Sequence, residues 1–468
     1  MATVFCVTSF AADEPADDTV LRVNGIKENG DIVKVEDYKV FDDGWNAAMD
    51  LATSRSKMRE QGFIRVEVVL YKDWIADNGE FTDEWDNGPG FNWDAIYFKD
   101  YVRITLDLNG HTVDRGLTEA ELNGEVMYIE EDADIVIKNG TIKGGFSNNG
   151  AGGIQVEGGS KLLLQNVNVI DNSVEDDNGA AIALYDGAKL TMIGGSIKNN
   201  SVIFDGDDTT RGTVYVEEST AIFNEVTFSG NEGRSGAVIY AGDSTVTLND
   251  CIVENNERND VNDNFNSSSL FYTNSTAFSI NGGEIKNNGS ANKASIFFLD
   301  GTFNMTECEI KDNNTDSIFC ENNGGGMECV YYISNCKFTG NDGLITVQYT
   351  SPKSNRDYDV VFNFVNCEFN NNDANRKYGY SFYADPYVDI SLIDCKIGNT
   401  TFCNKQYIDF GRGEGVGSMF GEGSLALIVA FVALVASVAA IVVNVYNNKN
   451  KKPALAADNG DEESDDEE

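Results

Sequence analysis

The sequence predicts an all-β solenoid of about ten stacked coils, with an N-terminal α/β cap and one C-terminal transmembrane helix. Three observations lead to this prediction: one phrase recurs ten times, its spacing is that of a single coil, and a charge-free stretch follows the last copy. The phrase reads apolar–x–apolar–x–x–small–x–apolar–x–x–Asn, and successive copies lie 25 to 32 residues apart. A repeat of this length is typical of coils that stack on one another rather than of a globular core.

The columns of this repeat describe a short strand that turns a corner. Asn tolerates left-handed backbone and bonds its own turn, so we expect it at one fixed corner of every coil. We also expect stacked Asn side chains to bond one another along the axis. The small column reads Gly140, Val167, Gly195, Val226, Cys251, Gly283, Cys308, Cys336, Cys367 and Cys395. The Asn column reads Gly145, Asn172, Asn200, Asn231, Asn256, Asn288, Asn313, Asn341, Asn372 and Thr400.

The second half of each repeat indicates another strand, as at Gly153–Val156, Ala181–Leu184 and Gly212–Val216. The first half alone also fits a leucine-rich repeat, which would continue with helix-spaced leucines. Here the residues that follow alternate with the period of two of a β-strand, and many of them are β-branched or aromatic. The pattern therefore favours a parallel β-helix over a leucine-rich horseshoe.

With these repeats, the chain resembles the right-handed parallel β-helix repeat family of the pectate-lyase-like class, which includes surface proteins of the polymorphic-outer-membrane-protein type. The segment Leu106–Val113 resembles the first coil of such proteins, and the resemblance covers roughly residues 100–410. It implies a right-handed parallel β-helix. It implies little about activity, because this scaffold carries both enzymes and adhesins.

The segments outside the repeats predict export and membrane anchoring. A signal peptide is expected at the N-terminus. It has no basic n-region, so the signal is either weak or truncated. Basic residues after the apolar stretch place the C-terminus in the cytoplasm and the coils outside the cell. The expected divisions are 1–12 signal peptide, 13–100 cap, 101–410 β-helix, 411–424 Gly-rich linker, 425–446 transmembrane helix and 447–468 acidic cytoplasmic tail.

The cap is expected to cover the open end of the solenoid. Asp43 could begin a helix that runs through Trp45 and Met49 to Gly62, with apolar residues at helical spacing. Ile64–Tyr71 alternates as a strand.

The chain holds 76 acidic and 34 basic residues, for a formal net charge of −42. Nucleic-acid binding needs a basic footprint, so this class of partner is not expected. The acidic surface is expected to be solvated. Ca²⁺ at Asp- and Asn-rich corners is the only cofactor considered, although no segment has the spacing of a calcium-binding loop. No other cofactor and no metal site is predicted.

Eight cysteines remain once Cys6 leaves with the signal peptide. Five of them stand in the small column, where we expect them to act as small apolar filler. Neighbouring coils lie about 4.8 Å apart, a distance that permits disulfides, but stacked strands seldom offer suitable Cβ directions. No CxxC pair indicates zinc.

A local pairing of nucleophile and histidine is not expected, because the only histidine, His111, lies in a turn of the first coil. The Gly-His-Gly and Arg-Ile-Lys motifs of polygalacturonase-like members are missing. The alternative catalytic site is an acidic edge formed by two neighbouring insertions, which carry Asp176, Asp177, Asp207, Asp208 and Arg211. Crowded carboxylates raise one another's pKa or recruit a cation, as glycoside hydrolysis or elimination would require. Two solvated acidic loops are the simpler interpretation.

An aromatic column on the second strand is the candidate ligand-binding site. Its members are expected to face outward in register and are Tyr215, Phe271, Phe297, Phe319 and Tyr383. Such a strip suits sugar faces, a partner protein or self-association. A phase error of one residue would instead place these side chains in the core, and a covering loop would hide them.

We therefore expect a membrane-anchored cell-surface protein that acts as an adhesin or as a module for binding a polysaccharide or a surface protein, without catalysis. The alternative is a surface-tethered polysaccharide lyase or glycoside hydrolase that uses the acidic edge.

Overall fold

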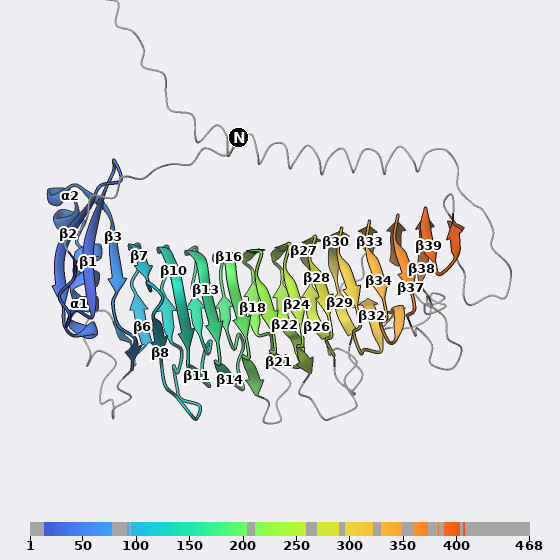
Figure 1. Cartoon of the computed structure of the whole chain (residues 1–468), viewed down its shortest axis with the longest axis horizontal. Coiled ribbons are helices and arrows are strands. Elements are labelled where there is room, and N and C mark those ends of the chain that lie inside the picture. Colours follow the sequence, from blue (N-terminus) through green and yellow to red (C-terminus); the bar gives the residue numbers. More distant parts are fainter. Residues whose placement is uncertain are drawn as a thin grey trace, which may run out of the picture. The chain divides into compact units, whose positions relative to one another are not determined.

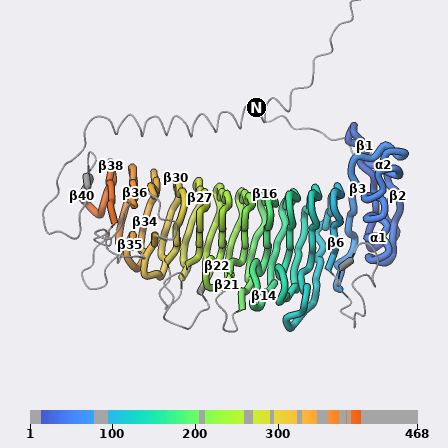
Figure 2. The backbone as a smooth tube through the Cα atoms, turned by 180° about the vertical axis from the view of Figure 1, so that it is seen from behind, coloured from blue at the N-terminus to red at the C-terminus, as the bar shows by residue number. Residues whose placement is uncertain are grey.

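The computed structural model describes residues 14–76, 91–92, 95–203, 211–258, 269–289, 295–321, 329–348, 360–372, 382, 388–402 and 406–407. These residues form an all-β, right-handed solenoid of about nine turns with few helices. Equivalent strands of successive coils lie side by side and run parallel, as Figures 1 and 2 show. The predicted parallel β-helix is therefore confirmed. The leucine-rich alternative is wrong, because strands occupy both halves of the repeat.

The strands belong to three sheets, which we call the long, second and short sheets. The long sheet comprises β1 (Leu21–Lys27), β2 (Ile32–Tyr38), β3 (Phe63–Leu70), β4 (Trp74–Ile75), β7 (Arg103–Asp107), β8 (Thr112–Asp114), β10 (Asp134–Lys143), β13 (Lys161–Ile170), β16 (Lys189–Lys198), β19 (Thr220–Asn224), β20 (Thr227–Ser229), β23 (Thr245–Asn249), β24 (Ile252–Glu254), β27 (Thr276–Asn281), β28 (Glu284–Lys286), β30 (Gly301–Thr306), β31 (Glu309–Lys311), β33 (Cys329–Ser334), β34 (Lys337–Thr339), β36 (Val360–Val365), β37 (Glu368–Asn370), β38 (Asp389–Ile393), β39 (Cys395–Ile397), β40 (Thr400–Phe402) and β41 (Gln406–Tyr407).

The second and short sheets complete each coil. The second sheet comprises β5 (Phe91–Asn92), β6 (Ala95–Phe98), β9 (Met127–Ile129), β12 (Ile154–Val156), β15 (Ile182–Leu184), β18 (Val214–Glu217), β22 (Ser235–Gly242), β26 (Ser269–Asn274), β29 (Ser295–Leu299), β32 (Ser317–Glu321) and β35 (Leu344–Gln348). The short sheet comprises β11 (Phe146–Ser147), β14 (Ser173–Glu175), β17 (Ser201–Ile203), β21 (Glu232–Gly233) and β25 (Glu257–Arg258).

Left-handed residues make the corners of each coil. In the coil that contains β13, the φ angles of Gly159, Asn166 and Asp171 are +70°, +52° and +54°. Asn166 and Asp171 each stand one residue before a column position, Val167 and Asn172. The expected left-handed Asn is therefore displaced by one residue, because Asp171 adopts the positive φ and leaves the side chain of Asn172 free to turn inward.

The buried Asn column forms the expected ladder. The Nδ2 amide of Asn200 donates to the carbonyl of Lys198 two residues earlier, at 3.2 Å, and to the carbonyl of Val169 one coil back, at 3.0 Å. The same amide reaches Oδ1 of Asn231 in the next coil at 3.1 Å. Each amide thus closes its own corner and links neighbouring coils, which satisfies polar groups that would otherwise be buried without a partner.

The cysteines of the small column do more than fill space. Sγ of Cys395 lies 3.4 Å from the carbonyl oxygen of Ile393, two residues earlier, and 3.2 Å from that of Phe364, one coil back. This is the hydrogen-bond pattern of the Asn ladder, made by a thiol, and Cys367 repeats it. The five cysteines of the column are buried and form no disulfide among the described residues. Cys6 and Cys403 lie outside the described residues.

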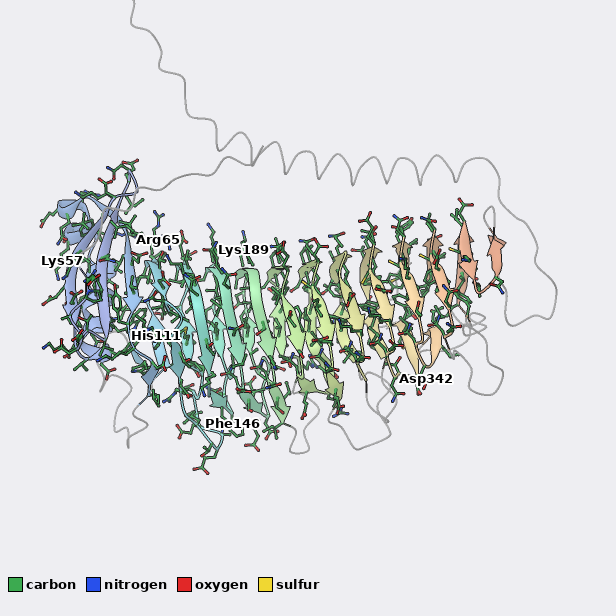
Figure 3. The ribbon with its side chains drawn as sticks, in the orientation of Figure 1. Lys57, Arg65, His111, Phe146, Lys189 and Asp342 are labelled. Atoms are coloured by element: carbon green, nitrogen blue, oxygen red, sulfur yellow. The ribbon has the colours of Figure 1, made fainter. Side chains whose placement is uncertain are left out.

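The N-terminal elements close one end of the coil stack. The predicted unbroken helix is instead two helices, α1 (Phe41–Thr53) and α2 (Arg55–Gln61), separated by Ser54. The ring of Trp45 in α1 packs edge-on against Phe98 in β6, with centroids 5.0 Å apart, so α1 covers the interior of the first coil. Arg65, labelled in Figure 3, links β3 to the first coils by donating to the carbonyl of Ile104 and the carboxylate of Asp134.

No helix among these residues is long and apolar enough to cross a membrane. The predicted signal peptide (1–12), linker (411–424), transmembrane helix (425–446) and cytoplasmic tail (447–468) lie outside the described residues and stay predictions.

Candidate functional site

The expected aromatic binding column is partly wrong. Phe271 of β26, Phe297 of β29 and Phe319 of β32 are fully buried and stack on one another inside the coil, with centroids 5.2 Å apart. Their register partner in β18 is the inward-facing Val214, not Tyr215. These three rings are core residues. Tyr383 lies outside the described residues.

A local change of register explains the error. Arg211 pairs with Ser235 and Val214 pairs with Ile239, so the chain advances three residues between these two pairs in one coil and four in the next. When one coil has an extra residue, every later side chain of its strand moves to the opposite face, because successive side chains of a strand alternate between the two faces. Tyr215 was placed correctly on the outside, whereas the positions counted from Ile239 onward were placed on the wrong side.

The outward column of the second sheet is one residue further along, and it is aromatic. Tyr215 pairs in register with Tyr240, Tyr272 and Phe298 of the next three coils. Their ring centroids lie 5.2, 4.9 and 5.0 Å apart, with interplanar angles of 8°, 15° and 22°. Tyr185 adds a tilted ring 5.5 Å from Tyr215. We call Tyr185, Tyr215, Tyr240, Tyr272 and Phe298 the tyrosine row.

The rings of this row cover one another's faces and expose little area. Tyr215 is 8% exposed and Tyr240 is 4% exposed, whereas Tyr185 and Tyr272 are half-buried. Near-parallel stacking leaves the faces inside the row and directs ring edges and hydroxyl groups outward. The row is therefore not the open flat strip that the sequence suggested.

Charged groups contact the hydroxyl groups of the row. Nη1 of Arg211 donates to Oη of Tyr240 at 2.9 Å, and its guanidinium carbon lies 4.9 Å from the centre of the same ring. Oη of Tyr215 donates to Glu217 at 3.2 Å. Burial raises the pKa of Tyr240 to about 12 and also raises the pKa of Tyr215 and of Glu217. The hydroxyl groups therefore stay protonated at neutral pH. The hydroxyl of Tyr240 accepts from Arg211 and keeps its own proton to donate, whereas that of Tyr215 already donates to Glu217.

The described part of the acidic edge is occupied by local contacts. Oδ2 of Asp177 accepts from the Gly150 amide at 2.7 Å, and Oδ1 accepts from the Asn178 amide at 2.8 Å. Asp176 adopts φ +57° and shapes the same turn. Arg211 contacts Tyr240 rather than these carboxylates. Asp207 and Asp208 lie outside the described residues, so the pairing of the two insertions stays a prediction.

Metal ligands and the single histidine were also considered as parts of a site, within the described residues. No group of three or more His, Cys, Asp or Glu side chains among the described residues could hold a metal ion. Nδ1 of His111 lies 3.2 Å from Oδ1 of Asp73, which also accepts from the Thr112 amide at 2.9 Å. This backbone hydrogen bond, with His111 beside it, lowers the pKa of Asp73. His111 thus caps the junction with the N-terminal elements, as Figure 3 shows.

Comparison with known proteins identifies the coils. Residues 103–301 match the family model for the right-handed β-helix region. The coils are those of a right-handed β-helix protein. The match and the parallel register confirm the resemblance that the repeats predicted. The comparisons with curated proteins and with solved structures gave no match. The β-helix assignment therefore rests on the family model and on the fold.

Proposed function

We propose that this β-helix protein is anchored in the cell membrane by residues 425–446 and binds a polysaccharide or a partner protein outside the cell, without catalysis. The observation that carries the proposal is the tyrosine row, which lies outside the main core with Arg211 and Glu217 at its hydroxyl groups. Tyrosine and arginine give aromatic contact area and oriented donors, a combination that is enriched where proteins bind partners.

The position of the row supports a role in recognition. It lies on the second sheet, next along the chain from the described corner segment 176–181, which joins β14 to β15. Loops held on a rigid scaffold are where binding residues concentrate. A β-helix repeats the same corner in every coil, so ligand contacts from several coils would line one edge.

The binding experiment uses the full-length chain, screened against a glycan array and against cultured cells. We expect Tyr185→Ala combined with Tyr272→Ala to reduce binding at least tenfold, because these are the half-buried rings of the row. Tyr101→Ala is the matched control, since Tyr101 is 60% exposed and lies outside the row. Unchanged binding in the double variant would remove the row from the proposal.

Anchoring has its own test. Deletion of residues 425–468 should move the chain from the membrane fraction into the medium, because a charge-free stretch of this length suffices to span a bilayer. Substitution of the acidic tail residues alone is the control and should leave the chain in the membrane fraction. Retention of the deleted chain in membranes would contradict the proposed anchor.

A further inference from the structure

The outward side of four neighbouring strands in the long sheet carries no charge. Twelve outward positions of β19, β23, β27 and β30 are half-buried or exposed, and we call them the neutral face. They are Thr220, Ile222, Asn224, Thr245, Thr247, Asn249, Ala277, Ser279, Asn281, Thr302, Asn304 and Thr306. Since 24% of the whole chain is charged, a solvated surface of this size would ordinarily include several charged side chains.

The neutral face has clear boundaries. One coil earlier, Lys189 occupies the position in register with Thr220, and it is labelled in Figure 3. In the same coils, the strands beyond the next corner carry a network in which Lys286 and Lys311 both pair with Glu284. Charge therefore bounds the neutral face on these two sides. Beyond β30 the outward positions of β33 and β36 are also uncharged, and charge returns at Asp389 of β38.

The face presents its groups in straight rows along the axis. The strands pair in register and in parallel, so Thr220, Thr245, Ala277 and Thr302 form one row at about the 4.8 Å spacing of neighbouring strands. Two further rows start at Ile222 and Asn224. β-Branched side chains hold few rotamers, which keeps the hydroxyl groups of the rows in fixed positions.

The amides of the third row are already ordered. Nδ2 of Asn249 donates to Oδ1 of Asn224 at 2.8 Å, and Nδ2 of Asn281 donates to Oδ1 of Asn249 at 2.8 Å. Oγ of Ser334 continues this row by donating to Thr306 at 3.1 Å. Each linked amide keeps a second N–H and a further lone pair. Groups held in place before binding lose less entropy when a ligand arrives.

An aromatic ring continues the middle row beyond the neutral face. Tyr332 of β33 pairs in register with Asn304 and is half-buried. A half-buried ring beside rows of hydroxyl and amide groups can pack against the C–H face of a sugar while the rows bond its hydroxyl groups.

Carboxylates line both edges of the face and restrict the ligand. Glu218 and Asp243 are exposed at the corner before the strands, and Glu225, Asp250 and Glu307 are exposed at the corner after them. These carboxylates would repel an anionic polymer. A polycation would find carboxylates only at the two edges, because the neutral face between them has no charged side chain. A ligand with many hydroxyl groups and no charge matches both the floor and its edges.

We propose that the neutral face binds a neutral linear polysaccharide laid along the axis of the coils, with Tyr332 against one sugar ring. The site lies on the long sheet and is independent of the tyrosine row on the second sheet. Several coils would contribute equivalent donors and acceptors, so affinity should rise with the length of the polysaccharide.

The experiment measures retention of the full-length chain on cellulose, chitin and a soluble neutral β-glucan, with polygalacturonate and chitosan as charged probes. The test variants are Thr247→Glu combined with Ser279→Glu, and Tyr332→Ala. Ser229→Glu in β20 combined with Thr339→Glu in β34 is the matched control, because it introduces the same two charges at half-buried positions outside the face.

We expect retention on at least one neutral polysaccharide, insensitivity of this retention to salt, and a loss of at least tenfold in both test variants but not in the matched control. Circular dichroism of each variant checks that the coils still form. Retention only on chitosan, with strong salt dependence, would overturn the proposal. So would the absence of binding to every neutral probe, or a self-associated chain that becomes monomeric in the Thr247→Glu, Ser279→Glu variant.

Discussion

The Nδ2 amide of Asn231 donates to Oδ1 of Asn256 at 2.9 Å, one coil further along the axis. The backbone amide of Asn231 donates to the same oxygen at 3.0 Å. Oδ1 of Asn231 in turn accepts from both the backbone and the side chain of Asn200. One buried side chain therefore joins three coils, and the corner depends on every one of these hydrogen bonds.

We expect Asn231→Ala to lower the free energy of unfolding by about 3 kcal/mol, because it leaves the Asn200 amide and the Ile197 carbonyl buried without their partner. Chemical denaturation followed by circular dichroism measures the change. Asn281→Ala removes an exposed Asn that donates to Asn249 in the surface row and should cost only about 0.5 kcal/mol. Equal effects of the two substitutions would show that burial of the ladder does not determine its contribution.

Glu125 should make stability depend on pH. It is 3% exposed, its Oε2 has no hydrogen-bond partner among the described residues, and burial raises its pKa from 4.5 to about 7. Folding therefore favours the protonated acid, so its contribution is complete below about pH 4.5 and is lost as the pH rises through 7. We expect Glu125→Gln to match the wild type at pH 4.5 and to be more stable at pH 8, by about 3 kcal/mol at most.

Urea denaturation of both proteins between pH 4.5 and 8 tests this expectation. Glu232→Gln, an exposed acid in β21, is the control and should follow the wild-type profile. Parallel profiles for Glu125→Gln and the wild type would show that Glu125 does not titrate on folding.

The buried thiols should be inert in the folded protein. Burial raises the pKa of Cys251 to about 11 and that of Cys308 to about 12, so neither is a thiolate at pH 8. We expect iodoacetamide at pH 8 to leave both unmodified, as read by mass spectrometry of their peptides. The same treatment in urea is the control and should modify both. Rapid modification without urea would mean that the coils open locally.

The catalytic alternative predicts a product that the binding proposal does not. We expect no new reducing or unsaturated ends when the full-length chain is incubated with acidic and neutral polysaccharides, with or without Ca²⁺. A product that disappears in Asp177→Ala or Asp207→Ala would establish the acidic edge as an active site. Glu232→Ala is the control for the loss of a carboxylate elsewhere on the surface.

Most of the fold could be predicted because it depends on local spacing. The small and Asn columns mark two corners in every coil, and a corner needs the same residue types wherever it occurs. Positions close to these corners, such as the buried Val167 and Val169, were therefore assigned correctly. The split of the cap helix at Ser54 was missed. The apolar spacing belongs to α1 alone, and α2 has a single apolar residue, Met58, and no buried side chain.

The candidate site was predicted less well because its strand lies many residues after the Asn column, which marks the corner of each coil. Insertions of different length separate the Asn column from the second strand, and the extra residue between Ser235 and Ile239 reverses the facing of every position counted onward from Tyr215. Tyr240 and Tyr272 were consequently missed, and Phe271 was assigned to the surface. The alternation of Phe271, Tyr272 and Thr273 does contain a signal, since the phenolic side chain is the more polar of the two aromatics and faces outward.

The sequence by itself determined the repeat, the coil and its ladder, because stacking brings equivalent positions together regardless of the length of the loops between them. Only the tertiary structure decided which aromatic side chains face the interior, that the cysteines bond the corners, and that an uncharged face extends across four strands. Those properties depend on register between residues of different coils, and a single insertion changes that register without altering the repeat.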